Sequence, residues 1–178
     1  AEGLVRVTPE TPVEVLVSML AYMSSCTTVA RATAIRKWGG FFDRQYCVYA
    51  EDAFLWIKVL LNEGVAFYTE PLTCIHREAS SLSNLTDTRS VEPFLLYPED
   101  IEAVCPSVLR ELLACLIARR AFKRACVLGC WGHWREAAEL RRRFARPGAW
   151  RLAYYFPALV ASTPIGAVTG AVCRALIR

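Results

Sequence analysis

The sequence predicts a mixed α/β fold: a partial mixed sheet with flanking helices, followed by an all-helical C-terminal region. Two observations support this prediction. Runs of small, β-branched or apolar residues near 24–31, 65–69 and 72–76 are typical of short strands. Apolar residues recur at helical spacing over 12–23 and 51–63, and the C-terminal half continues with helical periodicity alone.

The composition is that of a folded protein with unevenly distributed charge. A length of 178 residues suffices for a sizeable core, and 54% hydrophobic residues with a mean hydropathy of +0.27 exclude a disordered chain. Residues 1–108 hold 8 Lys/Arg and 14 Asp/Glu, a net charge of −6. Residues 109–178 hold 13 and 3, a net charge of +10. Such a basic half can attract an anionic membrane surface or nucleic acid.

The eight cysteines include no Cys-x-x-Cys pair. Several lie inside apolar helical or strand patterns, so we expect buried free thiols in a reducing compartment. A zinc site that includes Cys74 and His76 is an alternative, but the short-spaced ligand pairs that zinc sites use are missing.

The N-terminal part predicts a helix, a strand and a second, shorter helix. The stretch Thr11-Pro12-Val13-Glu14 predicts a helix start, with Thr11 as the N-cap and Glu14 reaching back to it. A short helix over 32–38 is expected to end at Gly39-Gly40, where a positive φ costs little. Residues 1–10 show no core pattern.

An adjacent acid pair, Glu51-Asp52, begins the central helix over 51–63, and Gly64 ends it. Free backbone N–H groups and the helix dipole favour carboxylates in a first turn, so local physics explains the pair as a helix cap. The strands over 65–69 and 72–76 follow, the second ending at His76. We expect residues 77–90, which are polar and rich in Ser and Thr, to form a loop.

The C-terminal region predicts a helical hairpin and then an uncharged tail. One helix follows Ser107 and runs towards Gly129, and a second covers 133–145. Residues 152–173 carry no charge, but prolines and glycines interrupt them. Three arrangements remain open for this tail: spanning a membrane, lying in its interface or re-entering it, and packing on the protein. Arginines before it, with aromatic residues at its start, favour an interfacial segment.

The order of motifs in residues 24–83 supplies a more specific signal. The relevant residues are Gly39-Gly40-Phe41-Phe42-Asp43, Glu51-Asp52, Trp56, Lys58, Gly64, Glu70-Pro71-Leu72, and His76 with Ser80, Ser81 and Ser83. This ordered set resembles the family 2 glycosyltransferases of GT-A fold. The sequence departs from the family pattern in the additional Phe42 and in Lys58, where the family usually has arginine.

The resemblance implies a domain division and an activity. Residues 1–90 would be the acceptor-side half of a GT-A-like domain, residues 91–148 a helical hairpin extension, and residues 149–178 a membrane-associated tail. The activity would be inverting transfer of a sugar from a nucleotide-sugar donor to a hydroxyl of a glycan or lipid-linked acceptor. We expect a cytoplasmic protein, peripheral on the inner face of the membrane.

The resemblance also implies roles for three residues. Asp52 would be the general base and Glu51 would orient the acceptor or the backbone. His76 would contact the diphosphate of the donor and its divalent cation, Mn²⁺ or Mg²⁺. No Asp-x-Asp motif and no glycine-rich phosphate loop occur in the chain. A preceding nucleotide-binding half would therefore supply most of the ligands of the cation, and the chain alone would be inactive. The truncated sheet would leave an exposed edge or face where that half would pack.

Two other function classes compete with this interpretation. In the first, the chain is a non-catalytic helical adaptor or membrane-associated interaction module, and the acid pair only caps a helix. The second is a nucleic-acid binder, suggested by the basic half. We expect no nucleic-acid binding, because the arginines alternate with long apolar runs and no recognition motif is present.

Overall fold

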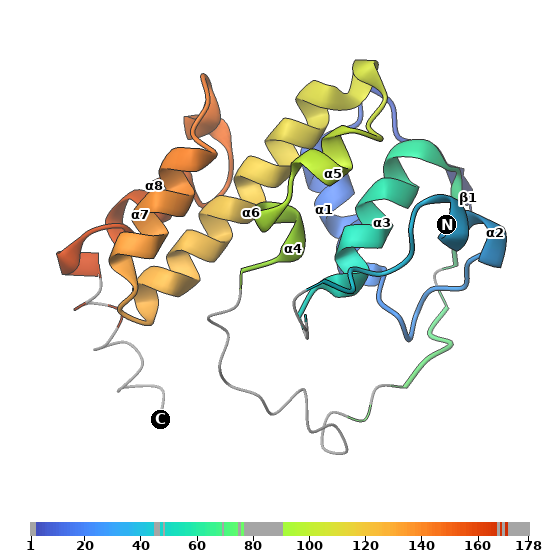
Figure 1. Ribbon diagram of the computed structural model, residues 1–178, viewed down its shortest axis with the longest axis horizontal. Coiled ribbons are helices and arrows are strands. Elements are labelled where there is room, and N and C mark those ends of the chain that lie inside the picture. The colour runs from blue at the N-terminus through green and yellow to red at the C-terminus, as the bar shows by residue number, and fades with distance from the viewer. Residues whose placement is uncertain are drawn as a thin grey trace. The chain divides into compact units, whose positions relative to one another are not determined.

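The computed structural model describes most of the chain (Figure 1). The described residues are 3–44, 47, 49–68, 70–74, 76, 91–166, 168 and 170. The chain divides into two compact units: residues 1–86 with 92–113, and residues 87–91 with 114–178. Helix α6, Arg110–Cys130, runs from the first unit into the second. The domain boundaries that the sequence suggests, at residues 90 and 148, stay predictions.

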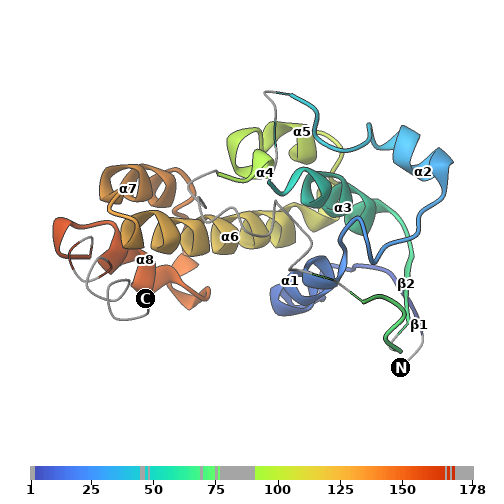
Figure 2. The same ribbon diagram turned by 90° about the horizontal axis from the view of Figure 1, so that it is seen from below.

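The first unit is built around one buried helix. Helix α3, Glu51–Asn62, is buried at every position from 54 to 61. Helix α1, Val13–Tyr22, packs on one side of it, and the short helices α4, Pro93–Leu96, and α5, Glu99–Glu102, pack on another (Figure 2). Helix α2, Ala32–Lys37, completes the unit with the 3₁₀ helix η2, Ser107–Leu109.

The core of this unit consists of large apolar side chains from several elements. Trp56 and Leu55 from α3, Leu16 from α1, and Phe94 and Ile101 from α4 and α5 are each at most 2% exposed. Full burial of one such side chain stabilises a fold by about 1.5–3 kcal/mol. Helix α3 contributes more buried positions than any of its neighbours, which explains its central place.

The sheet differs from the predicted one. Strand β1, Gly3–Val5, pairs antiparallel with strand β2, Val65–Phe67, with Leu4 opposite Ala66. The predicted strand over 65–69 is therefore confirmed up to Phe67, and Thr69 lies outside the described residues. Its partner comes from the N-terminal ten residues, where no core pattern was visible. Three residues are too few to show the alternation on which strand prediction depends.

The predicted strands over 24–31 and 72–76 are wrong for the described residues. Residues 25–27 form a turn, because side-chain hydroxyl groups take the backbone hydrogen bonds that a neighbouring strand would otherwise make. The Thr27 hydroxyl accepts from the amide of Ser24 at 3.1 Å and donates to the carbonyl of Tyr22. Side-chain hydroxyls of this kind compete with strand hydrogen bonding. In the second segment, the Thr73 hydroxyl donates to the carbonyl of Cys26 at 3.4 Å.

Helix α1 begins two residues after the predicted N-cap. The cap position is Pro12, and the Thr11 hydroxyl instead accepts from the amide of Thr8 at 2.9 Å. Thr11 therefore closes the preceding turn rather than the helix, and the predicted capping box is wrong. Glu14 does lie in the first turn, where the helix dipole favours a carboxylate.

The second unit contains the predicted helical hairpin. The C-terminal part of α6 is followed by α7, Trp134–Arg143, after a turn in which Gly132 has a φ of +91°. The chain then forms the 3₁₀ helix η3, Ala149–Arg151, and the uncharged run that follows it contains helix α8, Tyr155–Ala161. Helix α8 packs on α7.

Close backbone contacts hold the tail on α6. A Cβ atom added to Gly129 would overlap the carbonyl oxygen of Ala161. A Cβ on Gly170 would lie 2.5 Å from the Cα of Cys130. The tail thus packs on the protein, one of the three arrangements open at the sequence level. Within the described residues, no helix has the length and apolarity needed to cross a membrane.

The expectation of buried cysteines is mostly wrong. All seven described cysteines are free, but only Cys105 is buried, and Cys26, Cys74 and Cys130 are exposed. The helical and strand patterns in which the cysteines lie do not reveal which face turns outward. Half-burial, with the neighbouring Cys130, raises the pKa of the Cys126 thiol to about 11, which leaves it protonated and unreactive at neutral pH.

The contact between α6 and α8 gives a stability prediction. Substitution Gly129→Ala should lower the free energy of unfolding by about 1–3 kcal/mol, because the added methyl group forces the two backbones apart. Limited proteolysis should then cut the tail faster. The control is Cys130→Ala, which shortens an exposed side chain at the next position. Unchanged stability and unchanged cleavage for Gly129→Ala would contradict the packed tail.

Candidate functional site

Three polar contacts fasten the end of α2 to α3. Glu63 accepts hydrogen bonds from the ammonium of Lys37 at 2.8 Å and from the indole N–H of Trp38 at 3.0 Å. Lys58 donates to the carbonyl of Trp38 at 3.4 Å. Gly39 and Gly40 follow at once, with φ of +83° and +73°, values that non-glycine residues rarely adopt. The glycine turn therefore leaves α2 at a fixed point beside α3.

The two phenylalanines after this turn lie in different surroundings. Phe41 is partly exposed and meets Trp56 edge-on, with ring centroids 5.7 Å apart. Phe42 is buried between Phe54, at 5.1 Å, and Tyr97, at 5.6 Å. The phenylalanine that departs from the family pattern is thus a core residue.

Phe42 also closes the loop that leads to the acid pair. Its backbone N–H donates to the carbonyl of Glu51 at 3.1 Å, so the loop begins and ends at the same place. Arg44 fixes the loop further: its guanidinium lies 4.8 Å above the Tyr97 ring and forms an ion pair with Asp100. These contacts place the first turn of α3 relative to the glycine turn.

Lys58, inside α3, is an unusual core residue. Its side chain is 9% exposed, and its ammonium lies 4.2 Å above the Phe54 ring. Burial, helped by the charge of Arg44, lowers the pKa of Lys58. The carbonyl of Trp38 and the face of the ring offset part of the cost of burying this charge.

The acid pair lies half-buried at the start of α3. The preceding residue, Ala50, has a φ of +58°, which costs about 1–2 kcal/mol for a residue other than glycine. One carboxylate oxygen of Asp52 accepts from the amide of Ala53 at 2.7 Å. The other lies 3.5 Å from the hydroxyl of Ser25, which donates to it. Asp52 thus joins the helix start to the 25–27 turn.

The segment that carries His76 passes the same turn. The Thr73 hydroxyl bonds to the carbonyl of Cys26, the neighbour of Ser25. His76 lies three residues further on and is exposed. The Thr73 hydroxyl and the Asp52 carboxylate thus contact the same short turn. Ser80, Ser81 and Ser83, and the whole predicted loop over 77–90, lie outside the described residues.

The described residues do not form a complete metal site. No three His, Cys, Asp or Glu side chains in this part of the chain gather closely enough to hold an ion. The described residues therefore hold no complete metal centre of their own. The alternative of a zinc site at Cys74 and His76 has no support among them either.

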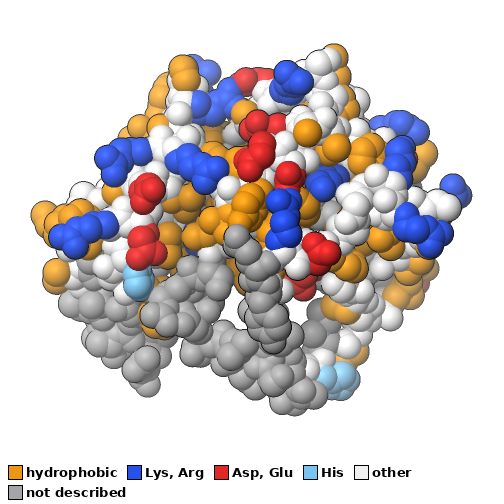
Figure 3. Space-filling model, in the orientation of Figure 1, with side chains coloured by type: hydrophobic (Ala, Val, Ile, Leu, Met, Phe, Trp, Pro, Cys, Tyr) orange, Lys and Arg blue, Asp and Glu red, His pale blue; other side chains and the backbone are white. Residues whose placement is uncertain are grey.

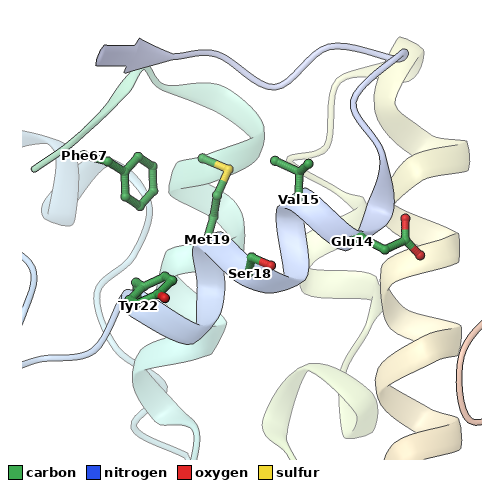
Figure 4. A pocket seen from close by; sticks show the side chains of 6 residues that line it. All are labelled: Glu14, Val15, Ser18, Met19, Tyr22 and Phe67. Carbon is green, nitrogen blue, oxygen red and sulfur yellow. The ribbon is translucent and has the colours of Figure 1, made fainter. Parts of the chain in front are cut away.

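A shallow groove of about 310 Å³ lies on the first unit, between α1 and β2 (Figure 4). Met19, Tyr22 and Phe67 provide its apolar walls, and Glu14 lies at one end. None of the residues predicted to act in catalysis lines it. The groove is therefore separate from the acid pair.

Sequence reasoning missed two parts of the site. The hydroxyl-rich stretch Ser24 to Thr28 was interpreted as a strand, although Ser and Thr clusters are equally typical of turns. The contact of Arg44 with Asp100 joins residues 56 positions apart, and no local pattern announces such a pair. The roles predicted for Glu51, Asp52 and His76 stay predictions.

Comparison of the chain with protein-family models, with curated proteins and with solved structures found no match. The functional argument therefore depends on the residues themselves. They place a half-buried carboxylate at the start of a buried helix, beside a hydroxyl-rich turn and an exposed histidine segment.

The contacts of Glu63 predict an acid-sensitive junction between α2 and α3. Hydrogen bonds from Lys37 and Trp38 lower the pKa of Glu63 in the folded protein. A carboxyl whose pKa falls on folding stabilises the fold above its ordinary pKa and loses that contribution as the pH drops through the lowered value. The free energy of unfolding should therefore decrease on acidification below about pH 4.5, as measured by denaturant titration.

The matched variants are Glu63→Gln and Glu10→Gln. The first should flatten the acid limb of the stability profile, because the amide no longer titrates. The second removes an exposed carboxyl elsewhere and should leave the profile as in the wild type. Equal profiles for all three proteins would contradict a role of Glu63 in holding α2.

Proposed function

We propose that the chain is the acceptor-side part of an inverting glycosyltransferase, with Asp52 as the general base. The ordered motifs from Gly39 to His76 support the class of enzyme. The observation that supports the role of Asp52 is the long hydrogen bond at one of its carboxylate oxygens, which lies 3.5 Å from the hydroxyl of Ser25. A base must lie within hydrogen-bond reach of the proton it takes, and the long contact to Ser25 is one that an acceptor hydroxyl can replace.

The reaction would use Asp52 as follows. Its carboxylate accepts the proton of the acceptor hydroxyl while the hydroxyl oxygen bonds to the anomeric carbon of the donor. The bond from that carbon to the diphosphate breaks, and the nucleoside diphosphate leaves from the opposite face, so the configuration inverts.

The other predicted residues would position rather than react. The carbonyl of Glu51 accepts the hydrogen bond that closes the loop, so this residue holds the site together through its backbone while its half-buried carboxylate orients the acceptor. His76 would contact the diphosphate end of the donor. A divalent cation, when bound, would offset the charge of the leaving group, held mainly by a nucleotide-binding half with the family's Asp-x-Asp motif.

One observation favours the competing adaptor function. The hydrogen bond from the amide of Ala53 to Asp52, at 2.7 Å, is what a helix-capping carboxylate makes and requires no catalysis. If Asp52 only caps α3, any side chain that accepts this bond should serve equally well. The two functions therefore differ in what Asn or Ser at this position would do.

Asp52→Asn and Asp52→Ser should abolish most sugar transfer by the intact enzyme that the proposal implies. Both side chains can still accept from Ala53, so α3 should remain folded, but neither can act as the base. The expected loss in turnover is on the order of 10²–10⁴-fold. Release of nucleoside diphosphate from a panel of nucleotide-sugars measures it, with the melting temperature as the check on folding.

The matched control is Glu10→Gln, at an exposed acid outside the motifs from Gly39 to His76. It should keep wild-type turnover. Near-normal turnover of the two Asp52 variants would refute the assignment of the base. Absence of transfer by the wild-type enzyme with every donor would refute the proposed enzyme class and favour the adaptor.

His76→Ala should weaken metal-dependent binding of nucleoside diphosphates by the intact enzyme without unfolding it. The reason is that His76 is exposed and follows three residues after Thr73, whose hydroxyl contacts the turn that Asp52 also contacts. Calorimetric titration with and without Mn²⁺ measures the effect, and Cys74→Ser is the control at a nearby exposed position. An unchanged titration with a lowered melting temperature would make His76 a structural residue.

A further inference from the structure

The tail of the second unit has two faces of opposite character. The inner face consists of small buried residues: Ala158 and Ala161 of α8, followed by Gly166 and Gly170. Of these, Ala161 and Gly170 meet α6. The other face, here called the outer face, exposes large apolar side chains, each between 40% and 73% exposed. Its members are Trp150, Tyr154, Phe156, Val160, Ile165 and Val168.

This arrangement reverses that of an ordinary surface helix. Such a helix buries its large apolar residues and turns small or polar ones to water. In α8, the close backbone approach at Gly129 admits only small residues, so Phe156 and Val160, one turn apart, face outward. The six exposed apolar side chains all lie within residues 150–168, and such a concentration of exposed apolar side chains indicates an interaction site.

Arg151 places a positive charge at the outer face, and the sequence of the second unit is basic as a whole. Residues 114–178 hold 12 Lys/Arg and 2 Asp/Glu, a net charge of +10. The guanidinium of Arg151 lies 4.9 Å above the ring of Trp150, and that of Arg143 lies 5.3 Å above Phe144. Figure 3, which views the molecule from the side of α7, shows Lys and Arg side chains beside hydrophobic ones over that helix. Basic residues of this stretch are Arg141, Arg142, Arg143, Arg146 and Arg151.

We propose that the outer face and these arginines bind the surface of an anionic phospholipid bilayer. Trp150 and Tyr154 carry polar edges on apolar rings, which suits the headgroup region, and Phe156, Val160 and Ile165 can enter the acyl boundary. The guanidinium of Arg151, which is exposed beside Trp150, pairs with a lipid phosphate. Nucleic acid would leave the apolar residues in water, and a second copy would bring two strongly positive surfaces together.

The proposal refines the interfacial segment expected from the sequence. The tail does not leave the protein to enter the membrane; it stays packed on α6 and presents one side. This inference does not depend on the proposed transferase activity.

Co-sedimentation of the 178-residue chain with vesicles tests the proposal. Vesicles of phosphatidylcholine with about one third phosphatidylglycerol should bind the chain at low salt, and vesicles of phosphatidylcholine alone should bind it far less. Raising the salt concentration should weaken binding, because the charges are exposed and screened.

Two sets of variants separate the apolar and the charged contributions. The triple variant Phe156→Ser, Val160→Ser, Ile165→Ser should reduce the affinity by about tenfold or more, with an unchanged melting temperature. Its matched control is Val29→Ser, Leu72→Ser, Val108→Ser, at exposed apolar positions of the first unit, which should bind as the wild type does. The double variant Arg142→Gln, Arg151→Gln should weaken binding on the order of tenfold and flatten its salt dependence.

Three outcomes would overturn the proposal. The first is no binding to anionic vesicles at low salt. The second is wild-type binding by the Phe156, Val160, Ile165 triple variant. The third is a dimer in sedimentation velocity that this triple variant abolishes while vesicle binding stays unchanged, which would make the outer face a contact between copies of the chain.

Discussion

Burial of helix α3 is the constraint on which the first unit depends. Eight consecutive residues, 54–61, are buried, so the helix has no solvent face along this stretch and needs cover all round. Helices α1, α4 and α5 pack against it, and the side chains of Lys58 and Glu63 fasten α2. Few positions in α3 can change without altering several neighbours.

Helix α3 determines the geometry of the candidate site. Because α3 is fixed along its length, its first turn is fixed too, and with it Glu51 and Asp52. The hydrogen bond from Phe42 to Glu51 and the packing of Phe42 on Tyr97 return the preceding loop to the same point. A carboxylate held in this way can contact a hydroxyl without reorganising the protein, which a general base requires.

The second unit is packed through small residues instead of large apolar ones. Its tail has no charged residue between positions 152 and 173, yet α8 approaches α6 through glycine and alanine. Small residues allow backbones to come close, and the cost is that the large apolar side chains of the tail remain outside. The surplus of arginine on the same unit gives that exposed surface an electrostatic preference.

The sequence by itself determined the main helices and the order in which the residues of the candidate site follow one another along the chain. Periodicity located α1, α3, α6 and α7, and the pair Gly39-Gly40 located a turn, because these signals lie within a few consecutive residues. The position of Glu51-Asp52 at a helix start followed from the same pattern. Chemistry at that position stays a matter for experiment, since the acid pair would also suit a helix cap.

Only the tertiary structure decided which distant segments meet. It paired Gly3–Val5 with Val65–Phe67, replaced an expected strand by the 25–27 turn, and joined Arg44 to Asp100 across 56 residues. It also packed the described part of the tail on the protein, with Phe156 and Val160 facing outward. The physical reason is common to these cases. Short strands, hydroxyl-stabilised turns and small-residue contacts are selected by partners far along the chain, so local spacing carries little information about them.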